Sequence, residues 1–150
     1  MTLSQLKKLI SQKEGSKLDF KRQWYKKEEL KTELIKDVIA LANGNIHTIG
    51  EESYLIVGVK ENLDNPENNE LYDVYLERSC DDIKKQLLQN LHNYSTPAIH
   101  DLEIGRLTFE SKNIMVITIP FHPYLIKLKK KLMHYEKDTL LYRVGEVPLG

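Results

Sequence analysis

The sequence has few of the residues that crosslink a chain or carry it across a membrane. It contains a single cysteine, Cys80, so no disulfide can form within the chain, and a reducing intracellular setting is predicted. No apolar run approaches the roughly 20 residues that cross a bilayer, and the N-terminus lacks the apolar core of a signal peptide. These absences exclude a disulfide-stapled secreted scaffold and predict a cytoplasmic protein without a membrane partner.

The chain also lacks an excess of charge of either sign. Its 150 residues include 22 Lys and Arg against 22 Asp and Glu, so the formal net charge is zero. No overall field attracts nucleic acid or an anionic membrane, and any such partner must be met by a local patch. The length fits one domain with a real core. Because the chain stops at Gly150 without a helix or cap, we expect residues 1–150 to be a single domain from a longer protein, with a fused C-terminal domain beyond it.

The usual signatures of zinc and nucleotide sites are missing as well. The five histidines have no metal-ligand spacing, and no cysteine pair supports a zinc site. No Gly-x-x-x-x-Gly-Lys segment occurs, so no P-loop ATP site is predicted. As a nucleophile Cys80 has no obvious local partner, and we expect it to be a semi-buried helix residue.

Hydrophobic periodicity predicts alternating helices and strands. The expected helices are residues 3–10, 28–43 and 79–96, and the expected strands are 17–24, 54–59, 102–109, 114–119 and 142–145. The order is therefore (α)-β-α-β-α-β-β plus a C-terminal strand. Parallel pairing of the first strands through their helix, followed by a hairpin with its turn at 111–113, gives an α/β two-layer sandwich with a mixed sheet.

Two of the predicted strands have different patterns. Residues 54–59 are almost continuously apolar, which is typical of a central strand covered on both faces. In the strand 17–24, Leu18 and Phe20 fall on one face and Asp19 and Lys21 on the other. This alternation predicts a half-buried strand whose polar face is open.

The open face raises a chemical hypothesis. Asp19-Phe20-Lys21 has the (Asp/Glu)-x-Lys spacing of many metal-dependent nucleases, in which the carboxylate holds Mg²⁺ or Mn²⁺ and the lysine stabilises charge on phosphorus. The alternative is a surface ion pair. Glu61 follows the central strand, where ligand sites gather in α/β sheets, and its alternative is a solvated loop acid.

A lysine run near the C-terminus is the densest basic stretch. Tyrosines and leucines are interleaved with its members, which are Lys127, Lys129, Lys130 and Lys131. Together with Arg143, these lysines are candidates for phosphate contacts, and the tyrosines for stacking on bases. The alternative is a lysine-rich face that keeps the domain soluble.

Four segments together resemble the Schlafen-type AlbA-like domain. They are Glu14-Gly15-Ser16-Lys17-Leu18-Asp19-Phe20-Lys21, then Ala40-Leu41-Ala42-Asn43, then Tyr54-Leu55-Ile56-Val57-Gly58-Val59-Lys60-Glu61, and the closing Tyr142-Arg143-Val144-Gly145. No single segment is specific, but their order and spacing are, and the match spans roughly residues 10 to 146.

The resemblance implies an Alba-like fold and nucleic-acid binding. In members with RNase activity it also implies a three-carboxylate metal site, whose positions here are Glu14, Asp19 and Glu61, with Lys21 beside them. The sequence departs from the pattern, because the second acid is usually Glu and the third usually Asp. The usual Asn-Thr-x-Gly-Gly turn is also replaced by the longer segment 43–52.

These observations lead to alternative functions. The first hypothesis is a nucleic-acid-binding domain that hydrolyses phosphodiester bonds of structured RNA, with Mg²⁺ or Mn²⁺ on the three acids. The second is a non-catalytic module that binds RNA or DNA within a bacterial regulator. The third is a nucleotide-sensing or protein-interaction domain in which the acids are surface charges. Since RNase members of the family pair two such lobes and this chain supplies one, a homodimer is expected for the first.

Overall fold

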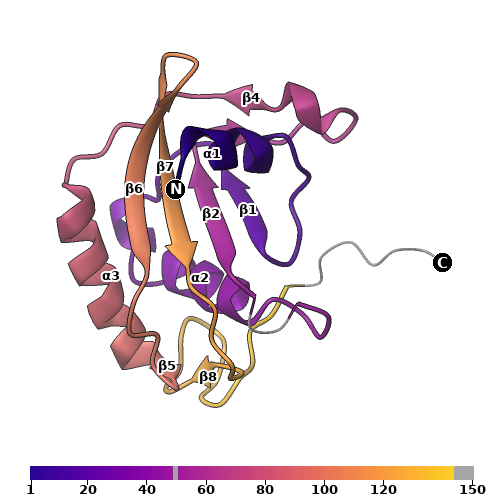
Figure 1. The fold of residues 1–150 in the computed structure, drawn as a ribbon. Helices are drawn as coiled ribbons and strands as arrows, with labels where there is room; N and C mark the ends of the chain where they lie inside the picture. Colours follow the sequence, from indigo (N-terminus) through magenta and orange to yellow (C-terminus); the bar gives the residue numbers. More distant parts are fainter. Residues whose placement is uncertain (49–50, 144–150) are drawn as a thin grey trace.

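A four-stranded mixed sheet forms the centre of the structure, a computed structural model that describes residues 1–48 and 51–143 (Figure 1). The helices are α1 (Leu3–Ile10), α2 (Glu33–Asn43) and α3 (Cys80–Tyr94), with short 3-10 turns at Lys27–Glu29 and Pro66–Asn68. The strands are β1 (Leu18–Lys21), β2 (Ser53–Val57), β3 (Val59–Lys60), β4 (Glu70–Leu71), β5 (Ser95–Thr96), β6 (Glu103–Phe109), β7 (Lys112–Ile119) and β8 (Lys127–Leu128).

The main sheet has the order β1-β2-β7-β6. As predicted, β1 and β2 pair in parallel, β2 is an interior strand, and β6 and β7 form an antiparallel hairpin. The hairpin turn lies at Glu110 and Ser111, whose φ angles are 49° and 66°. Two consecutive positive φ angles suit the right-handed twist of a hairpin, so the turn comes slightly earlier than the predicted 111–113.

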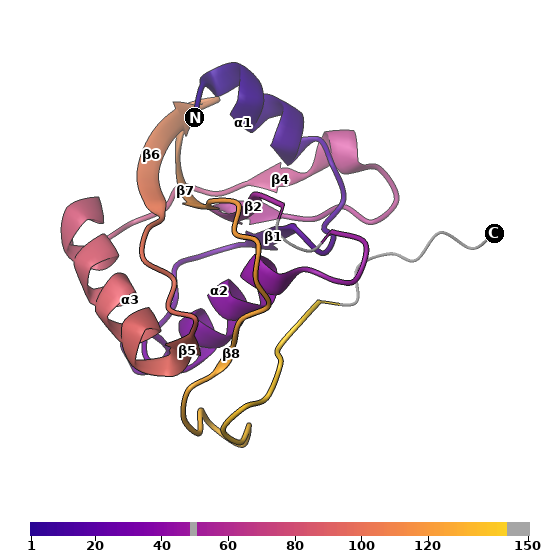
Figure 2. The same cartoon turned by 60° about the horizontal axis from the view of Figure 1, so that its bottom comes forward.

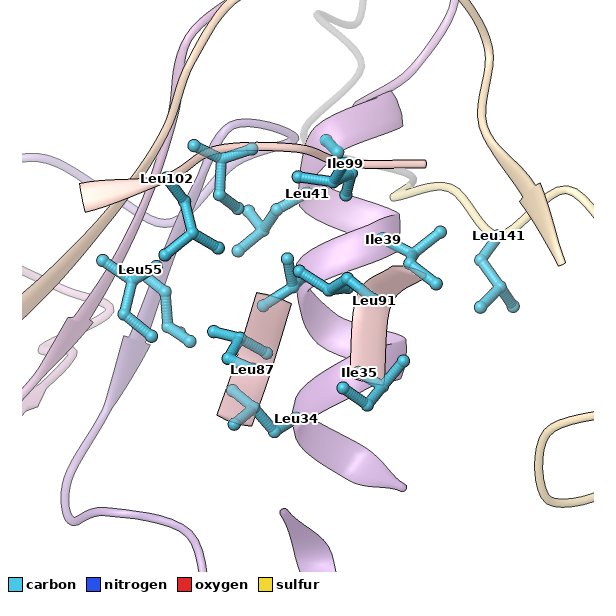
Figure 3. Packing of buried hydrophobic residues seen from close by; sticks show 14 of the residues in the cluster. Leu34, Ile35, Ile39, Leu41, Leu55, Leu87, Leu91, Ile99, Leu102 and Leu141 are labelled. Carbon is cyan, nitrogen blue, oxygen red and sulfur yellow. The ribbon is translucent and has the colours of Figure 1, made fainter. Parts of the chain in front are cut away.

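Helices cover both faces of this sheet, and the predicted α/β sandwich is confirmed. The larger core lies between the sheet and helices α2 and α3, and Figure 3 shows its leucines and isoleucines pointing toward one another. A smaller core lies under α1 on the opposite face. In β2 the alternation is visible directly: Leu55 and Val57 belong to the larger core, and Ile56 to the smaller one. Burial of each such side chain stabilises the fold by roughly 1.5–3 kcal/mol.

The helix ends follow their local sequence. Thr2 and Gln5 form the predicted capping box of α1, and Ser79 caps α3 by accepting the Asp82 N–H at 3.1 Å. The helix predicted for 28–43 begins only at Glu33, because Thr32 has a non-helical backbone (φ −129°, ψ −84°). Gly44 ends α2 at φ +64°, where an added Cβ would lie 2.6 Å from the Lys17 side chain.

The predicted open face of the first strand is wrong for Asp19. The strand is shorter than 17–24, and Leu18 and Phe20 are buried against α1 as expected. Asp19 is nevertheless only 5% exposed, because its face of β1 is turned toward the side that α2 covers. Lys21 on the same face is half-buried and reaches Asp37 of α2.

The C-terminal segment, residues 120–143, lies beneath α2 and α3 (Figure 2) and is held there by strand pairing and hydrogen bonds. Its strand β8 pairs with β5, and the buried Asn43 side chain bonds to the backbone N–H and C=O of Ile126 and to the C=O of Leu141, each at 2.7 Å. The strand predicted at 142–145 is not formed at Tyr142 and Arg143, and its other two residues lie outside the described ranges. Within those ranges, no helix has the length and apolar character needed to cross a bilayer.

Candidate functional site

A glycine turn brings Glu61 back toward Glu14. Gly58 has φ +106°, and a Cβ there would lie 2.7 Å from the Tyr72 carbonyl oxygen, so only glycine fits without a shift. After this turn and β3, the Glu61 Oε2 atom accepts a hydrogen bond from the Glu14 backbone N–H at 2.5 Å. This bond between Glu61 and Glu14 joins the segment that follows the central strand to the segment that precedes β1.

The Glu14 carboxylate faces the start of the sheet. Its Oε1 accepts the Phe20 N–H at 3.0 Å. Burial raises the pKa of Glu14, and the nearby charges of Asp19 and Glu61 raise it further, while the Phe20 hydrogen bond and Arg143 lower it. Glu14 is thus close enough to both of the other predicted acids to be repelled by each.

The Asp19 carboxylate lies between two cations. Its Oδ2 is 3.4 Å from Lys21 Nζ, and its Oδ1 is 3.5 Å from Arg143 Nη1. Oδ2 is buried and has no hydrogen-bond partner among the described residues. Because Lys21 and Arg143 flank it, the negative charge of Asp19 is largely compensated by the protein itself.

The same ion-pair network continues onto α2. Lys21 Nζ is also 3.4 Å from Asp37 Oδ2, and that oxygen accepts the Tyr25 hydroxyl at 2.5 Å. Although burial lowers the pKa of Lys21, its two carboxylate neighbours outweigh this and raise it. Sequence reasoning missed Asp37 and Tyr25. One signal was present, since Asp37 falls three residues after Leu34 and four before Leu41 and so borders the buried stripe of α2.

Arg143 lies in this cluster and not on the lysine run. Its Nε donates to the Gly15 carbonyl oxygen at 3.0 Å, and its backbone N–H donates to the Gly44 carbonyl oxygen at 2.8 Å. With the Asp19 contact, these bonds fix the end of the described chain against β1 and the end of α2. The resemblance had marked Arg143 as part of a motif, but its partner could not be read from sequence.

Lys17 also has a role that the sequence analysis missed. Its Nζ donates to the carbonyl oxygens of Leu41 and Ala42, at 3.1 and 2.8 Å, in the last turn of α2. These carbonyls have no partner within the helix, so the lysine caps them. Burial lowers the pKa of Lys17 to about 8.

The lysine run is exposed, and part of its charge is paired. Lys127 lies 3.3 Å from Asp138, and Lys131 lies 3.5 Å from Glu136. The Lys130 ammonium lies over the Tyr94 ring, 4.5 Å from its centroid. Residues 127–138 contain five lysines and two acids, so the segment is locally basic in a neutral chain.

The carboxylates do not fit a three-carboxylate metal site in this arrangement. Glu14 and Glu61 are bonded to backbone N–H groups, and Asp19 contacts two cations. Across residues 1–48 and 51–143, no group of three His, Cys, Asp or Glu side chains is arranged to hold a metal ion. Metal binding by these acids, and catalysis through Mg²⁺ or Mn²⁺, therefore stay predictions.

The model of the family described as Schlafen, AlbA_2 matches residues 14–147. The chain belongs to this family. The match includes the acidic cluster, which is formed by Glu14, Asp19 and Glu61 with Lys21 beside them, and it also includes the lysine run. It bears out the resemblance seen in the sequence. Membership fits a nucleic-acid-related domain.

Solved structures support the fold. The N-terminal domain of a RecG-related protein from Nitrosomonas europaea aligns with a TM-score of 0.57 at 17% identity, covering 96% of this chain and 88% of that one. The DIP2311 protein from Corynebacterium diphtheriae aligns with a TM-score of 0.54 at 17% identity, covering 95% of this chain but 28% of that one. At this identity the similarity shows the fold alone. No curated protein matches the sequence.

Proposed function

We propose that this domain is a nucleic-acid-binding module whose acidic cluster is structural. The observation that carries the binding proposal is the local basic segment: five lysines against two acids over residues 127–138 of a chain with no net charge. All four lysines of the predicted run are exposed, and Tyr124 beside them is 61% exposed. Exposed cations meet phosphates and exposed rings stack on bases.

The structural role of the acids is supported by their partners. Asp19, Lys21 and Asp37 join β1 to α2, and Arg143 joins the C-terminal segment to both. A buried network of this kind holds elements in register when each charge is paired. A nuclease would instead need these carboxylates free to bind cations.

Salt dependence of RNA and DNA binding tests the proposal. Affinity should fall steeply with salt, and the double variant Lys129→Ala/Lys130→Ala should weaken binding to all sequences. It should also reduce the slope of log K against log salt by about 0.7 for each single-strand phosphate that the removed lysines had neutralised. Lys7→Ala/Lys8→Ala, which removes two exposed charges from α1, is the matched control and should change little. Absence of binding at low salt would overturn the proposal.

The second candidate is a metal-dependent RNase acting on structured RNA. The observation in its favour is the buried Asp19 Oδ2 without a hydrogen-bond partner among the described residues, together with the raised pKa of Glu14. On this hypothesis, cleavage requires Mg²⁺ or Mn²⁺, stops with chelator, and is lost in Asp19→Asn and Glu61→Gln. The exposed acid Glu67, changed to Gln, is a suitable control, whereas Lys17 is not because it caps α2. Such cleavage by the purified protein would replace the binding-only function.

The partner predictions are part of the same proposal. A homodimer would supply a second lobe and with it a second copy of the lysine run, and a fused C-terminal domain is the other proposed partner. Light scattering with and without RNA measures the first. If the protein stays a monomer when it binds RNA, the homodimer is wrong and a single lobe makes all the contacts with RNA.

A further inference from the structure

A cleft of about 760 Å³ lies away from the lysine run and borders the ion-pair network of Asp19, Lys21 and Asp37 through Tyr25, whose hydroxyl bonds to Asp37. Volumes of roughly 300–1,000 Å³ are usual for ligand sites. The cleft is bordered by the connection between β1 and α2, the connection between β4 and α3, the first turn of α2 and the face of α3 from Ile83 to Asn90. Residues from all four parts line it, and those that carry the argument are Trp24, Lys31, Tyr75, Arg78, Gln86 and Asn90.

Both walls of the cleft are fixed by bonds to the sheet or to α2. Asp73 Oδ1 accepts the Asn113 N–H at 2.7 Å, and the Val74 N–H donates to the Asn113 carbonyl oxygen at 2.9 Å, which ties one wall to β7. On the other wall the Tyr25 hydroxyl is bonded to Asp37. The cleft is therefore formed before any ligand arrives, which lowers the ordering cost of binding.

Aromatic rings stand on the two walls. Trp24 packs edge-on against Tyr25, with ring centroids 5.3 Å apart and planes at 89°, so the fixed tyrosine orients the indole. Tyr75 on the facing wall is 81% exposed. Stacking of one base on an aromatic side chain is worth roughly 1–3 kcal/mol.

The charge around the cleft favours an anion. Four cations line it against two acids, and one of these acids, Asp73, is already bonded to the hairpin. The cations are exposed and can follow a phosphate backbone. They are Lys26, Lys27, Lys31 and Arg78.

The inner end of the cleft has amide groups on an apolar floor. Gln86 Nε2 donates to Asn90 Oδ1 at 3.2 Å, and Asn90 is 6% exposed. The two amides together have four N–H donors and two acceptor oxygens, so this one bond leaves capacity for a base edge. Leu34 and Leu87 supply the apolar surface beside them.

We propose that this cleft binds one unpaired nucleotide of a nucleic-acid strand. The base stacks against Trp24 and Tyr75, and Arg78 and the lysines hold its phosphate. The proposal rests on the proposed function for the identity of the ligand, and it assigns base contacts to a place distinct from the lysine run. Arg78 precedes α3 whereas Lys130 lies over Tyr94 at its last residue, so about 20 Å of helix separates these two cations, and Asn90 at the inner end of the cleft lies about one turn before Tyr94.

The protein contains its own reporter, because Trp24 is its only tryptophan. Fluorescence of the full chain is titrated with adenosine 5′-monophosphate, with single-stranded hexa-adenylate, and with a duplex that contains the same hexamer. We expect the hexamer to quench Trp24 and the other two probes to do so much more weakly. Arg78→Ala and Lys31→Ala should each raise the hexamer concentration needed for half-maximal quenching about tenfold, the effect of removing one charge-assisted hydrogen bond.

Controls separate this proposal from the proposed function. Lys85→Ala removes an exposed charge of α3 outside the cleft and should leave the quenching unchanged. Far-UV circular dichroism and the unfolding midpoint check that each variant is folded. Lys129→Ala/Lys130→Ala should reduce the overall affinity for longer single strands but leave the maximum quenching intact.

Three results would overturn the inference. If nucleic acid binds and depends on Lys129 and Lys130 but never quenches Trp24, the cleft is not the base site and the proposed function stands. If the monophosphate or the duplex quenches as strongly as the hexamer, the ligand is not an unpaired strand. If no nucleic acid binds at low salt, the cleft proposal and the proposed function fail together.

Discussion

Two regions of the molecule contain ion pairs of nearly equal length in very different surroundings. Asp19 lies 3.4 Å from Lys21 and 3.5 Å from Arg143, and Lys131 lies 3.5 Å from Glu136. The Asp19 side chain is 7% exposed, whereas those of Lys131 and Glu136 are 62% and 75% exposed. Water screens the second pair more strongly than the first, whose carboxylate is buried although its cations are partly exposed, so equal distances carry unequal free energies.

The region with the catalytic sequence pattern is also not the region that we expect to bind nucleic acid. The buried network contains the Asp-x-Lys pattern of a nuclease, yet its charges are compensated by one another. The exposed run has no catalytic pattern, yet its surplus of lysines can reach phosphates. Stability should therefore depend on the first region and nucleic-acid affinity on the second.

The largest expected effect is on stability from Asp19→Ala. The change leaves Lys21 and Arg143 beside an empty site, and breaking a buried ion pair typically costs several kcal/mol. Because both cations are partly exposed and Lys21 keeps Asp37, we expect a loss of about 2–3 kcal/mol in urea unfolding. Asp138→Ala, which breaks an exposed pair, is the control and should cost about 0.5 kcal/mol or less.

Equal losses in these two variants would remove the distinction between the regions. A stabilising effect of Asp19→Ala would indicate an acid kept for binding or chemistry at the expense of the fold. That outcome would return Asp19 to the metal hypothesis.

The sequence predicted the sheet well and the surroundings of its charges poorly. The apolar run of β2 and the alternation of Leu18 and Phe20 are local signals, and both predictions were confirmed. The burial of Asp19 depends on α2, which follows later in the chain, so alternation within the strand could not reveal it. The partners of Arg143 and Asn43 are more than 80 residues away in sequence for the same reason.

An intermediate effect is expected from Lys17→Met, which keeps the apolar stem and removes the cap of α2. Two carbonyl oxygens lose their hydrogen bonds, and we expect about 1 kcal/mol less stability at neutral pH. The surroundings of Lys17 are intermediate between those of the two regions. Its charge is half-buried, but its hydrogen-bond partners are backbone oxygens and not carboxylates. Glu51 and His122 are the titratable groups with which its charge interacts.

The pH dependence of the same variant sharpens the comparison. The pKa of Lys17 is lowered from 10.5 to about 8 in the folded protein, so between these values the unfolded chain holds a proton that the folded chain releases. The free energy of unfolding of the wild type should therefore rise with pH relative to that of Lys17→Met. Measurements from pH 7 to 9.5 stay below the range where the raised pKa of Tyr54, about 12, adds an opposite trend. A difference that stays constant with pH would mean that Lys17 is not desolvated.

The smallest effect is expected from the exposed pair of Lys127 and Asp138. A double-mutant cycle with alanine at both positions should give a coupling energy of about 0.3 kcal/mol, which disappears in 1 M salt because the screening length falls to about 3 Å. The corresponding cycle between Asp19 and Lys21 should keep most of its coupling at that salt concentration, since water and ions do not reach the buried carboxylate. RNA should compete with Asp138 for Lys127, so Asp138→Ala should bind RNA slightly more tightly than the wild type. Weaker RNA binding in Asp138→Ala would mean that this acid positions the lysine for its phosphate contact.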